Sequence, residues 1–528
     1  MWASPFVDVS NLATHPPKRK MERTSASGRL KVMAPRGRRW LPVCGLVAIA
    51  FVAAATPSLA AIACDLPDDS HCEDWIVRWD SGLNETPNGA FPEQANDSVA
   101  STDGERIFIT GQGFDGGKDS DALTIAFDAQ DGSVIWERRY GGRGSSGEYD
   151  AGYSIALSPD GTRVFVAGHQ NSDQEGRGDF LVVAYDASDG RKLWATSGRQ
   201  GRANAGFLVV APDGRKLFAF GSARVSGEKS NLVTVAYSAS SGKKLWAREY
   251  DGPVSGKDYP SDAAVDPEGK YLFVTGSSQA LAGRRNYDYV TIAYPLEGSP
   301  HKQWVLRSHK EGLGYATGSQ LAIPTGDALF LSGSHTRYDT VNTYATETLR
   351  VDPANGAVLW TKGETTMSAG SLGAPLLAAD PDGASVYLTG LPDTASAGQP
   401  LFGKRFLTKA YDAETGTERW SSLYEAPGTS VYLADVGVDG PRDSLYLTGV
   451  LIKTPQRDLL TVSLDTEDGS TRWSAQANPS ELPNAEAMAR TLALSPDGRI
   501  FVAGSVYDGQ GEKGGYGSAD VVVASYLP

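Results

Sequence analysis

Cysteine and histidine are scarce in this sequence. Of its 528 residues, three are cysteine (Cys44, Cys64 and Cys72) and six are histidine. No two cysteines are adjacent, and no two histidines have the spacing of a metal-binding pair. A disulfide-rich scaffold and a cysteine–histidine zinc motif are therefore excluded. The Gly-x-Ser-x-Gly elbow, the Cys-x-x-Cys pair and a phosphate-binding glycine loop that ends in Lys-Ser/Thr are also absent, so these common sequence signatures of catalysis are missing.

Basic residues are the minority among the charged ones. The chain has 49 Lys and Arg against 63 Asp and Glu, a net charge of −14. Residues 1–60 hold nine of the basic and two of the acidic groups, which leaves a net charge of −21 on residues 61–528. Because such a chain repels phosphate backbones, we predict no nucleic-acid partner.

Long apolar runs are lacking, with one exception near the N-terminus. Residues 41–55 are apolar, follow a basic stretch at 36–39 and precede Ser58-x-Ala60, a small-x-small cleavage signal. This run is short against the roughly 20 residues that span a bilayer, so it predicts a cleaved signal peptide rather than a membrane anchor. We expect residues 1–60 to be an N-terminal extension plus signal peptide that is removed. The mature protein, a single domain over 61–528 without a transmembrane segment, is then secreted or held in the cell envelope.

Cys64 and Cys72 are the cysteines that remain after this cleavage. A pair eight residues apart in an exported protein favours a disulfide. Lipid anchoring at Cys64 is the less favoured alternative, because Ala61-Ile62-Ala63-Cys64 lacks the leucine that a lipobox prefers.

Glycine is plentiful, with 60 residues, and one glycine-marked pattern repeats along the chain. An apolar run that ends in glycine, first seen as Ile107-Phe108-Ile109-Thr110-Gly111, recurs eight times at intervals of roughly 56 residues. The marked glycines are Gly111, Gly168, Gly221, Gly276, Gly333, Gly390, Gly449 and Gly504. A Pro-Asp-Gly turn, as at 159–161, often precedes the run and indicates a β-hairpin.

A second pattern keeps step with the first. Ala126-Phe127-Asp128-Ala129 leads to Gly132 and Trp136, and later copies keep this spacing. Each repeat thus supplies four short strands without a helical period, which is the pattern of a propeller blade. We predict an all-β, eight-bladed β-propeller.

The two ends of the chain explain how the ring closes. The last repeat stops at Tyr526, before its tryptophan strand. Residues 74–79 supply a strand of that kind, and Trp79 lies 57 residues before Trp136, in phase with the series. We expect this N-terminal strand to complete the last blade and remove an open sheet edge, with Trp75 as an extra tryptophan.

The Ala-x-Asp-x-x-x-Gly-x-x-x-Trp pattern, as in Ala410 to Trp420, resembles the tryptophan-docking motif of the PQQ-type quinoprotein alcohol dehydrogenases. That family is an eight-bladed propeller, and the resemblance covers nearly the whole mature chain. It implies that each tryptophan packs between blades against a glycine-containing turn that the aspartate secures. These structural docking roles fall on Asp128, Gly132, Trp136, Asp186, Gly190, Trp194, Asp352, Gly356, Trp360, Asp412, Gly416, Trp420, Asp465, Gly469 and Trp473.

The enzymes of this family clamp PQQ between a tryptophan and a disulfide of adjacent cysteines, beside a bound Ca²⁺. This chain has no adjacent cysteine pair, and no catalytic residue of the family can be placed in it. We therefore predict no cofactor and lean against catalysis, with PQQ and Ca²⁺ kept as alternatives.

Acidic loops are the candidates for a weak Ca²⁺ site, because hard oxygen ligands suit that ion. The candidate ligands are Asp115, Asp119, Asp121, Asp173 and Asp179. An aspartate at the start of the third strand recurs in several blades, at positions 121, 179, 288, 458 and 520. A turn cap is the simpler interpretation of a residue repeated in this way.

The most variable loops join the second strand to the third and so lie on one face of the ring. They span Ser277–Asp288, Ser334–Glu347, Leu391–Arg405 and Val450–Asp458. A binding face there would include Arg284, Arg285, Tyr287, Arg337, Tyr338, Phe402, Lys404 and Arg405. Because loops carry function while strands carry the fold, we predict a monomeric, non-enzymatic binding or scaffold protein for a protein or glycan partner. The alternatives are a PQQ-dependent alcohol or sugar dehydrogenase and, third, a polysaccharide hydrolase or lyase.

Overall fold

The computed structural model describes most of the chain. The described residues are 29–32, 63–64, 74–81, 93–114, 120–141, 149–172, 179–198, 203–224, 229–281, 286–297, 302–308, 315–337, 343–364, 367–368, 375–392, 405–428, 430–453, 456–479, 485–507 and 519–528. Within these ranges the structure is built of β-strands, with one short 3₁₀ helix, η2 (Gly440–Arg442). None of the described helices is long and apolar enough to span a bilayer.

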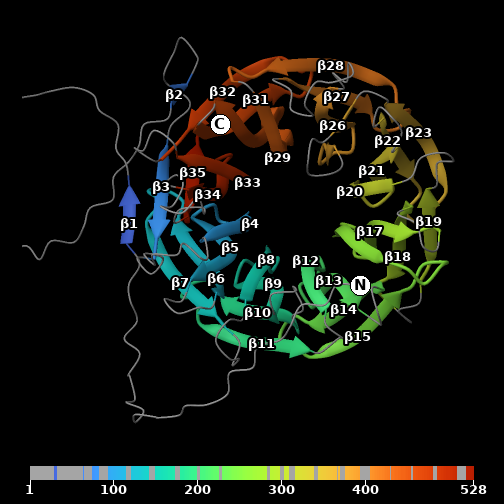
Figure 1. Ribbon diagram of the computed structural model, residues 1–528, viewed down its shortest axis with the longest axis horizontal. Helices are drawn as coiled ribbons and strands as arrows, with labels where there is room; N and C mark the ends of the chain where they lie inside the picture. Colours follow the sequence, from blue (N-terminus) through green and yellow to red (C-terminus); the bar gives the residue numbers. More distant parts are fainter. Residues whose placement is uncertain are drawn as a thin grey trace, which may run out of the picture.

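Eight antiparallel sheets of four strands stand around a common axis, so the predicted eight-bladed propeller is confirmed (Figure 1). Blade 1 comprises β4 (Gln94–Ala100), β5 (Arg106–Phe114), β6 (Ser120–Asp128) and β7 (Val134–Tyr140). Blade 2 comprises β8 (Tyr149–Leu157), β9 (Arg163–Ser172), β10 (Asp179–Asp186) and β11 (Lys192–Gly198). Blade 3 comprises β12 (Ala203–Val210), β13 (Lys216–Arg224), β14 (Ser230–Ser238) and β15 (Lys244–Tyr250). Blade 4 comprises β16 (Asp258–Val265), β17 (Tyr271–Gln279), β18 (Tyr287–Pro295) and β19 (Trp304–Ser308).

The second half of the ring follows the same plan. Blade 5 comprises β20 (Tyr315–Thr325), β21 (Ala328–Arg337), β22 (Thr343–Val351) and β23 (Val358–Glu364). Blade 6 comprises β25 (Leu376–Ala379), β26 (Ser385–Pro392), β27 (Arg405–Asp412) and β28 (Glu418–Glu425), and β24 (Met367–Ser368) also pairs with β26. Blade 7 comprises β29 (Ser430–Asp439), β30 (Ser444–Lys453), β31 (Gln456–Asp465) and β32 (Thr471–Ala477). Blade 8 comprises β33 (Glu486–Leu494), β34 (Ile500–Tyr507), β35 (Ala519–Tyr526) and β3 (Trp75–Asp80).

The ring is closed by β3, which pairs antiparallel with β35 and completes blade 8 as predicted. The register of the closing strand differs from the expectation. Trp75, not Trp79, faces Ser525 and donates its indole N–H to Ala129 O over 3.0 Å, as a docking tryptophan does. Trp79 lies at the other end of the strand, beneath the Arg139 guanidinium. The 57-residue spacing misled because no Asp-Gly turn joins β35 to β3, so chain connectivity does not fix their register.

Two short segments lie against the outer edges of blades 7 and 8. β1 (Arg29–Val32) pairs antiparallel with β3, and β2 (Ala63–Cys64) pairs with β32. Cys72 lies outside the described residues, so the expected Cys64–Cys72 disulfide stays a prediction.

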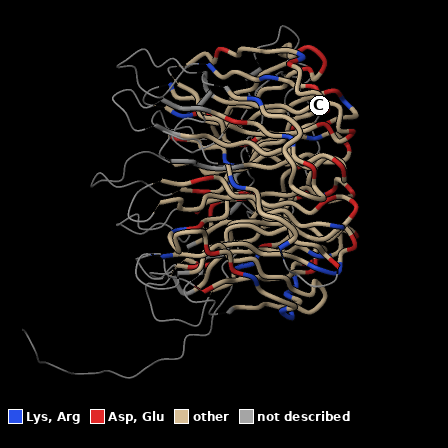
Figure 2. Tube along the Cα trace, turned by 90° about the vertical axis from the view of Figure 1, so that its right-hand side faces the viewer, with Lys and Arg blue, Asp and Glu red and all other residues tan. Residues whose placement is uncertain are grey.

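The hydrophobic core lies between neighbouring blades. One cluster, for example, joins Phe108 and Trp136 of blade 1 to Val164 and Leu181 of blade 2. Within each blade, the turns between strands 1 and 2 and between strands 3 and 4 lie at the same face of the ring, because all four strands are antiparallel. Figure 2 shows this disc edge-on, with acidic segments crowded along one face.

Five of the marked glycines, Gly111, Gly168, Gly276, Gly449 and Gly504, have a structural cause in the innermost strand. Opposite the marked glycine the first strand contains a β-bulge in blades 1–5, 7 and 8. The bulge presses a carbonyl oxygen against the glycine, so a Cβ on Gly111 would lie 1.7 Å from Gln94 O and one on Gly168 1.9 Å from Ala151 O. A side chain does not fit there, and this is why the repeat keeps glycine.

Candidate functional site

The docking residues lie at the contacts between blades. Trp136 of blade 1 is buried, and its indole N–H donates to Ala187 O of blade 2 over 3.1 Å. A Cβ on Gly190, which has φ +67°, would lie 2.6 Å from the Trp136 ring. The glycine therefore serves two needs, a left-handed backbone and the close approach of an aromatic ring.

The same indole-to-carbonyl bond recurs around the ring. It joins Trp75 to Ala129, Trp136 to Ala187, Trp194 to Ala239, Trp304 to Pro353, Trp360 to Ala413 and Trp420 to Thr466. Trp473 packs its ring against Tyr526 with centroids 5.8 Å apart. The docking glycines 132, 242, 356, 416 and 469 each face a tryptophan ring of the preceding blade, as Gly190 does.

The docking aspartates cap the turns in which these glycines lie. In blade 6, Asp412 accepts the backbone N–H of Thr415 over 2.9 Å and pairs with Arg419 over 2.9 Å. These bonds lower the pKa of Asp412 to about 2, because they favour the ionised carboxylate. Asp128, Asp186, Asp352 and Asp465 accept equivalent backbone bonds.

The Ca²⁺ candidates are only partly within the described residues. Asp115, Asp119 and Asp173 lie outside them, and Asp121 and Asp179 stand at the starts of β6 and β10. At the same position in other blades the carboxylates form ion pairs. Asp288 pairs with Arg307 over 2.9 Å, Asp458 with Lys453 over 2.9 Å, and Asp520 with Arg78.

The candidate binding face falls largely outside the described residues, which exclude Arg284, Arg285, Tyr338, Phe402 and Lys404. Tyr287 opens β18 opposite Gln279, and Arg337 ends β21 opposite Thr343. Arg405 opens β27 and forms an exposed ion pair of 3.1 Å with Glu425. These three strand ends mark the face from which the variable loops leave the ring.

A belt of polar side chains around the propeller axis was not found by sequence reasoning. Within two residues after its bulge, each of several innermost strands carries a side chain that accepts a backbone N–H from the next blade. The five donor–acceptor pairs are Ile155 to Asp97, Leu208 to Ser154, Leu321 to Asp262, Leu377 to Gln320 and Leu492 to Asp435, at 2.8–3.2 Å. We call Asp97, Ser154, Asp262, Gln320 and Asp435 the axial belt.

Three members of the axial belt are carboxyl groups with raised pKa values. Burial raises the pKa of Asp97 and of Asp262 to about 6 and that of Asp435 to about 7. The charges of Asp97 and Asp262 raise the pKa of Asp435 further, so the three groups act on one another across the axis. All three also accept backbone N–H groups, which lowers their pKa by a smaller amount.

The seam that closes the ring holds a second acidic cluster. Carboxylate oxygens of Asp80, Glu93 and Asp520 lie within 4.8 Å of one another. Arg78 pairs with Asp520, and Arg139 lies 3.5 Å from Glu93. Burial raises the pKa of Glu93 to about 7. Two guanidinium groups thus face three carboxyl groups, and the cluster serves as an ion-pair network across the seam.

Comparison with protein-family models matches residues 75–362 and 345–517 to the family described as outer membrane protein assembly factor BamB. A search of curated proteins found no match. Among solved structures, Sqt1 from Chaetomium thermophilum, bound to the N-terminus of the ribosomal protein L10, has a TM-score of 0.51 and 10% identity, over 83% of this chain and 97% of that one. A quinohemoprotein alcohol dehydrogenase from Comamonas testosteroni has a TM-score of 0.47 and 13% identity, over 83% of this chain and 75% of that one.

Proposed function

Since the chain belongs to the PQQ-repeat family described as outer membrane protein assembly factor BamB, we propose that it is an exported β-propeller that binds a partner or acts as a scaffold, without a reaction of its own. The family defines the fold and leaves a wide range of functions open. The proposal therefore rests on particular side chains of this molecule.

Three exposed aromatic side chains carry the proposed binding role. Tyr153, Phe207 and Tyr259 are 39%, 36% and 39% exposed, and they lie on β8, β12 and β16, the innermost strands of three consecutive blades. Exposed aromatic groups are enriched at protein–protein interfaces, where they supply large contact area at a small entropic cost. We propose that the partner contacts this inner rim together with the variable loops.

The uses of tryptophan and cysteine support a function without PQQ. Six indole N–H groups are hydrogen-bonded to carbonyls of neighbouring blades. These six tryptophan side chains therefore hold neighbouring blades together. The three cysteines all precede the strands of the propeller, and none is adjacent to another. A cofactor clamp of the quinoprotein type has no counterpart in this sequence.

The carboxyl groups of the axial belt do not favour a polysaccharide hydrolase. General acid–base chemistry needs carboxyl oxygens that are free to reach a substrate. Asp97, Asp262 and Asp435 each use one oxygen for the next blade and the other for the backbone of their own strand. We therefore assign these groups to structure.

A thermal melt with and without PQQ plus Ca²⁺, followed by a dye-linked assay on alcohols and sugars, separates the proposal from the dehydrogenase alternative. A ligand that binds only the native state raises the melting temperature. We expect no shift and no dye reduction. A rise in melting temperature together with turnover would make the protein a dehydrogenase.

Site-specific photo-crosslinking in the native host tests the binding role. The crosslinker is placed at Tyr153, Phe207 or Tyr259, and as matched controls at Leu359 and Leu423, which are 52% exposed on the outer strands β23 and β28. We expect one discrete product from the inner-rim positions and none from the controls. Equal yields at both sets would contradict a binding site at the inner rim.

A further inference from the structure

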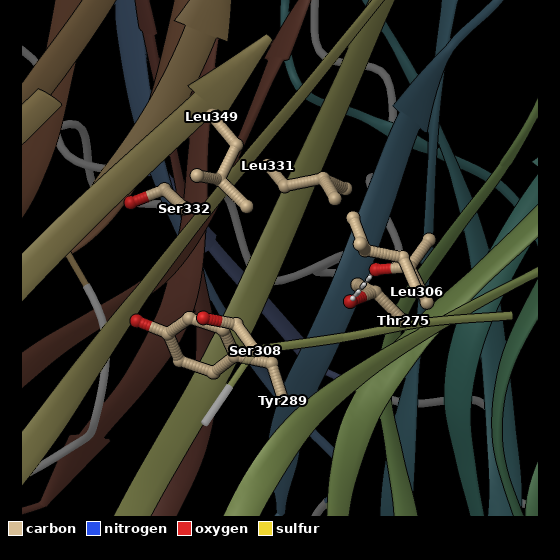
Figure 3. A pocket seen from close by; sticks show the side chains of 8 residues that line it. Thr275, Tyr289, Leu306, Ser308, Leu331, Ser332 and Leu349 are labelled. Atoms are coloured by element: carbon tan, nitrogen blue, oxygen red, sulfur yellow. Dashed lines mark hydrogen bonds between the residues drawn. The ribbon is translucent and has the colours of Figure 1, made fainter. Parts of the chain in front are cut away.

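The cavity between blades 4 and 5 is too small for an organic ligand. It has a volume of about 10 Å³, which is room for one water-sized group. Its lining includes Thr275, Tyr289 and Thr291 of blade 4 and Ser332 of blade 5 (Figure 3). The hydroxyl groups of Thr275 and Thr291 lie 3.0 Å apart, within hydrogen-bond distance of each other. The cavity therefore offers no room for a ligand, in contrast to the surface of the ring.

The turns of blade 3 are basic, on a face of the ring that is elsewhere rich in acidic residues. The two turns, residues 211–216 and 238–244, hold one acidic residue, Asp213, and four basic ones. The basic residues are Arg215, Lys216, Lys243 and Lys244. The corresponding turns of blade 6, residues 380–385 and 412–418, hold five acidic residues and no basic one. Figure 2 shows the acidic segments along one edge of the disc and several basic segments near its lower end.

Blade 3 lacks the docking aspartate that neutralises such a turn in other blades. In blade 2, Asp186 caps the turn and pairs with Arg191 over 3.2 Å. Blade 3 has Ser238 at the position of this aspartate and Lys243 at the position of the arginine. Gly242 N–H still donates to Ser238 O over 2.8 Å, so the turn is closed without a carboxylate. The positive charge of Lys243 therefore has no counter-ion within its own turn.

A backbone hydrogen bond holds the two basic turns of blade 3 together. Ala239 N–H donates to Arg215 O over 2.9 Å, which places Arg215 beside the turn that carries the two lysines. Arg215, Lys243 and Lys244 are exposed, and within the described part of the chain none of the three forms an ion pair. Leu245 follows Lys244 and is 46% exposed. These three cationic groups and this apolar side chain form one exposed surface, which we call the blade-3 patch.

We propose that the blade-3 patch binds an acidic segment of a partner protein. The carboxylates of such a segment pair with Arg215, Lys243 and Lys244, and an apolar side chain beside them contacts Leu245. An extended anionic surface fits less well, because a membrane or a nucleic-acid duplex laid across this face would also meet acidic turns such as those of blade 6. A narrow peptide segment avoids these turns. The patch lies on the face opposite to the variable loops, so this contact is separate from the one proposed at the inner rim.

Fluorescence anisotropy of a labelled octaglutamate peptide with the purified full chain tests the proposal. We expect one peptide to bind per chain at an ionic strength of about 0.02 M, and the affinity to fall steeply toward about 0.3 M because exposed charges are then screened. A DNA duplex of about 20 base pairs and phosphatidylglycerol vesicles should bind more weakly than the peptide. Failure of the peptide to bind at low ionic strength would overturn the proposal. Tighter binding of the duplex or of the vesicles would overturn the choice of a protein partner.

Two variants that give blade 3 the residues of other blades locate the bound peptide. Ser238→Asp supplies the missing docking aspartate and should weaken peptide binding about two- to fivefold, because the new carboxylate pairs with Lys243. The double variant Lys243→Ser with Lys244→Val should weaken binding about three- to tenfold. Its new residues are those that blade 1 has at the same positions, Ser133 and Val134.

Arg419→Ser is the matched control, because it removes one positive charge beside the turns of blade 6, where Arg419 pairs with Asp412. It should change the affinity for the peptide by less than about twofold. Equal affinity of the wild type and both blade-3 variants would refute the assignment of the site. Circular dichroism and the melting temperature check that each variant is folded.

Discussion

Asp435 is the member of the axial belt whose pKa is raised most, and it provides the sharpest test of the belt. Its carboxylate accepts Val436 N–H and, from blade 8, Leu492 N–H, each over 2.8 Å. The substitution Asp435→Asn keeps the shape of the side chain, removes the charge and keeps one acceptor oxygen. Its effect on stability should therefore depend on pH.

The magnitude follows from linkage between protonation and folding. The pKa of Asp435 rises from 3.8 to about 7, so the native state holds the proton more tightly than the unfolded chain. A raised pKa contributes stability below pH 4, and this contribution is lost as the pH rises from 4 through 7. At about 1.4 kcal/mol per pKa unit, ionisation of Asp435 costs up to about 4 kcal/mol of unfolding free energy above pH 7. Asparagine avoids this cost but gives up one acceptor, a loss of about 1–2 kcal/mol at every pH.

Urea unfolding followed by tryptophan fluorescence at pH 4.5 and pH 8 measures the effect. Relative to the wild type, Asp435→Asn should be less stable at pH 4.5 and more stable at pH 8. The control Asp412→Asn should cost the same at both pH values, because the pKa of Asp412 is lowered to about 2 and the group is ionised throughout. If the difference between Asp435→Asn and wild type does not change with pH, the reasoning about the axial belt is wrong.

Two further substitutions test the other contacts that hold the blades. Gly168→Ala places a Cβ 1.9 Å from Ala151 O and should cost about 3 kcal/mol of unfolding free energy in urea titrations, whereas Gly363→Ala, with nothing within 4 Å, should change it by less than about 1 kcal/mol. Trp136→Phe removes the indole bond to Ala187 O and part of a buried ring. It should lower the unfolding free energy by about 2–3 kcal/mol in the same assay, and a loss below about 0.5 kcal/mol would argue against the docking role.

The blade could be predicted from sequence because its signals are local. Gly168 and its copies mark a fixed point in every repeat, and the Asp-Gly turn at 189–190 sets the register of β10 and β11, the two strands that it joins. The closing strand has no such turn, since β35 and β3 lie at opposite ends of the chain. Residue spacing therefore predicted the strand correctly but placed Trp79 at the docking position, which Trp75 occupies in the structure.

The axial belt was missed because its members share a role rather than a residue type. Asp97, Asp262 and Asp435 each stand 14 residues before a marked glycine, and this was a signal that could have been found. The equivalent acceptors in blades 2 and 5 are Ser154 and Gln320, so the pattern is hidden when residues are compared by identity.

The marked glycine and the axial belt both depend on the β-bulge of the innermost strand. The β-bulge in the innermost strand pushes a carbonyl against the glycine, and directly after the bulge the chain presents an acceptor to the next blade, as at Gly111 and Asp97. Blade 1, for example, is thus joined to blade 2 at its inner strand by a belt hydrogen bond and at its outer strand by a tryptophan. Neither joint uses the loops between the second and third strands. These loops can therefore vary without loss of the ring, and for this reason a search for the partner should begin on the face that they form.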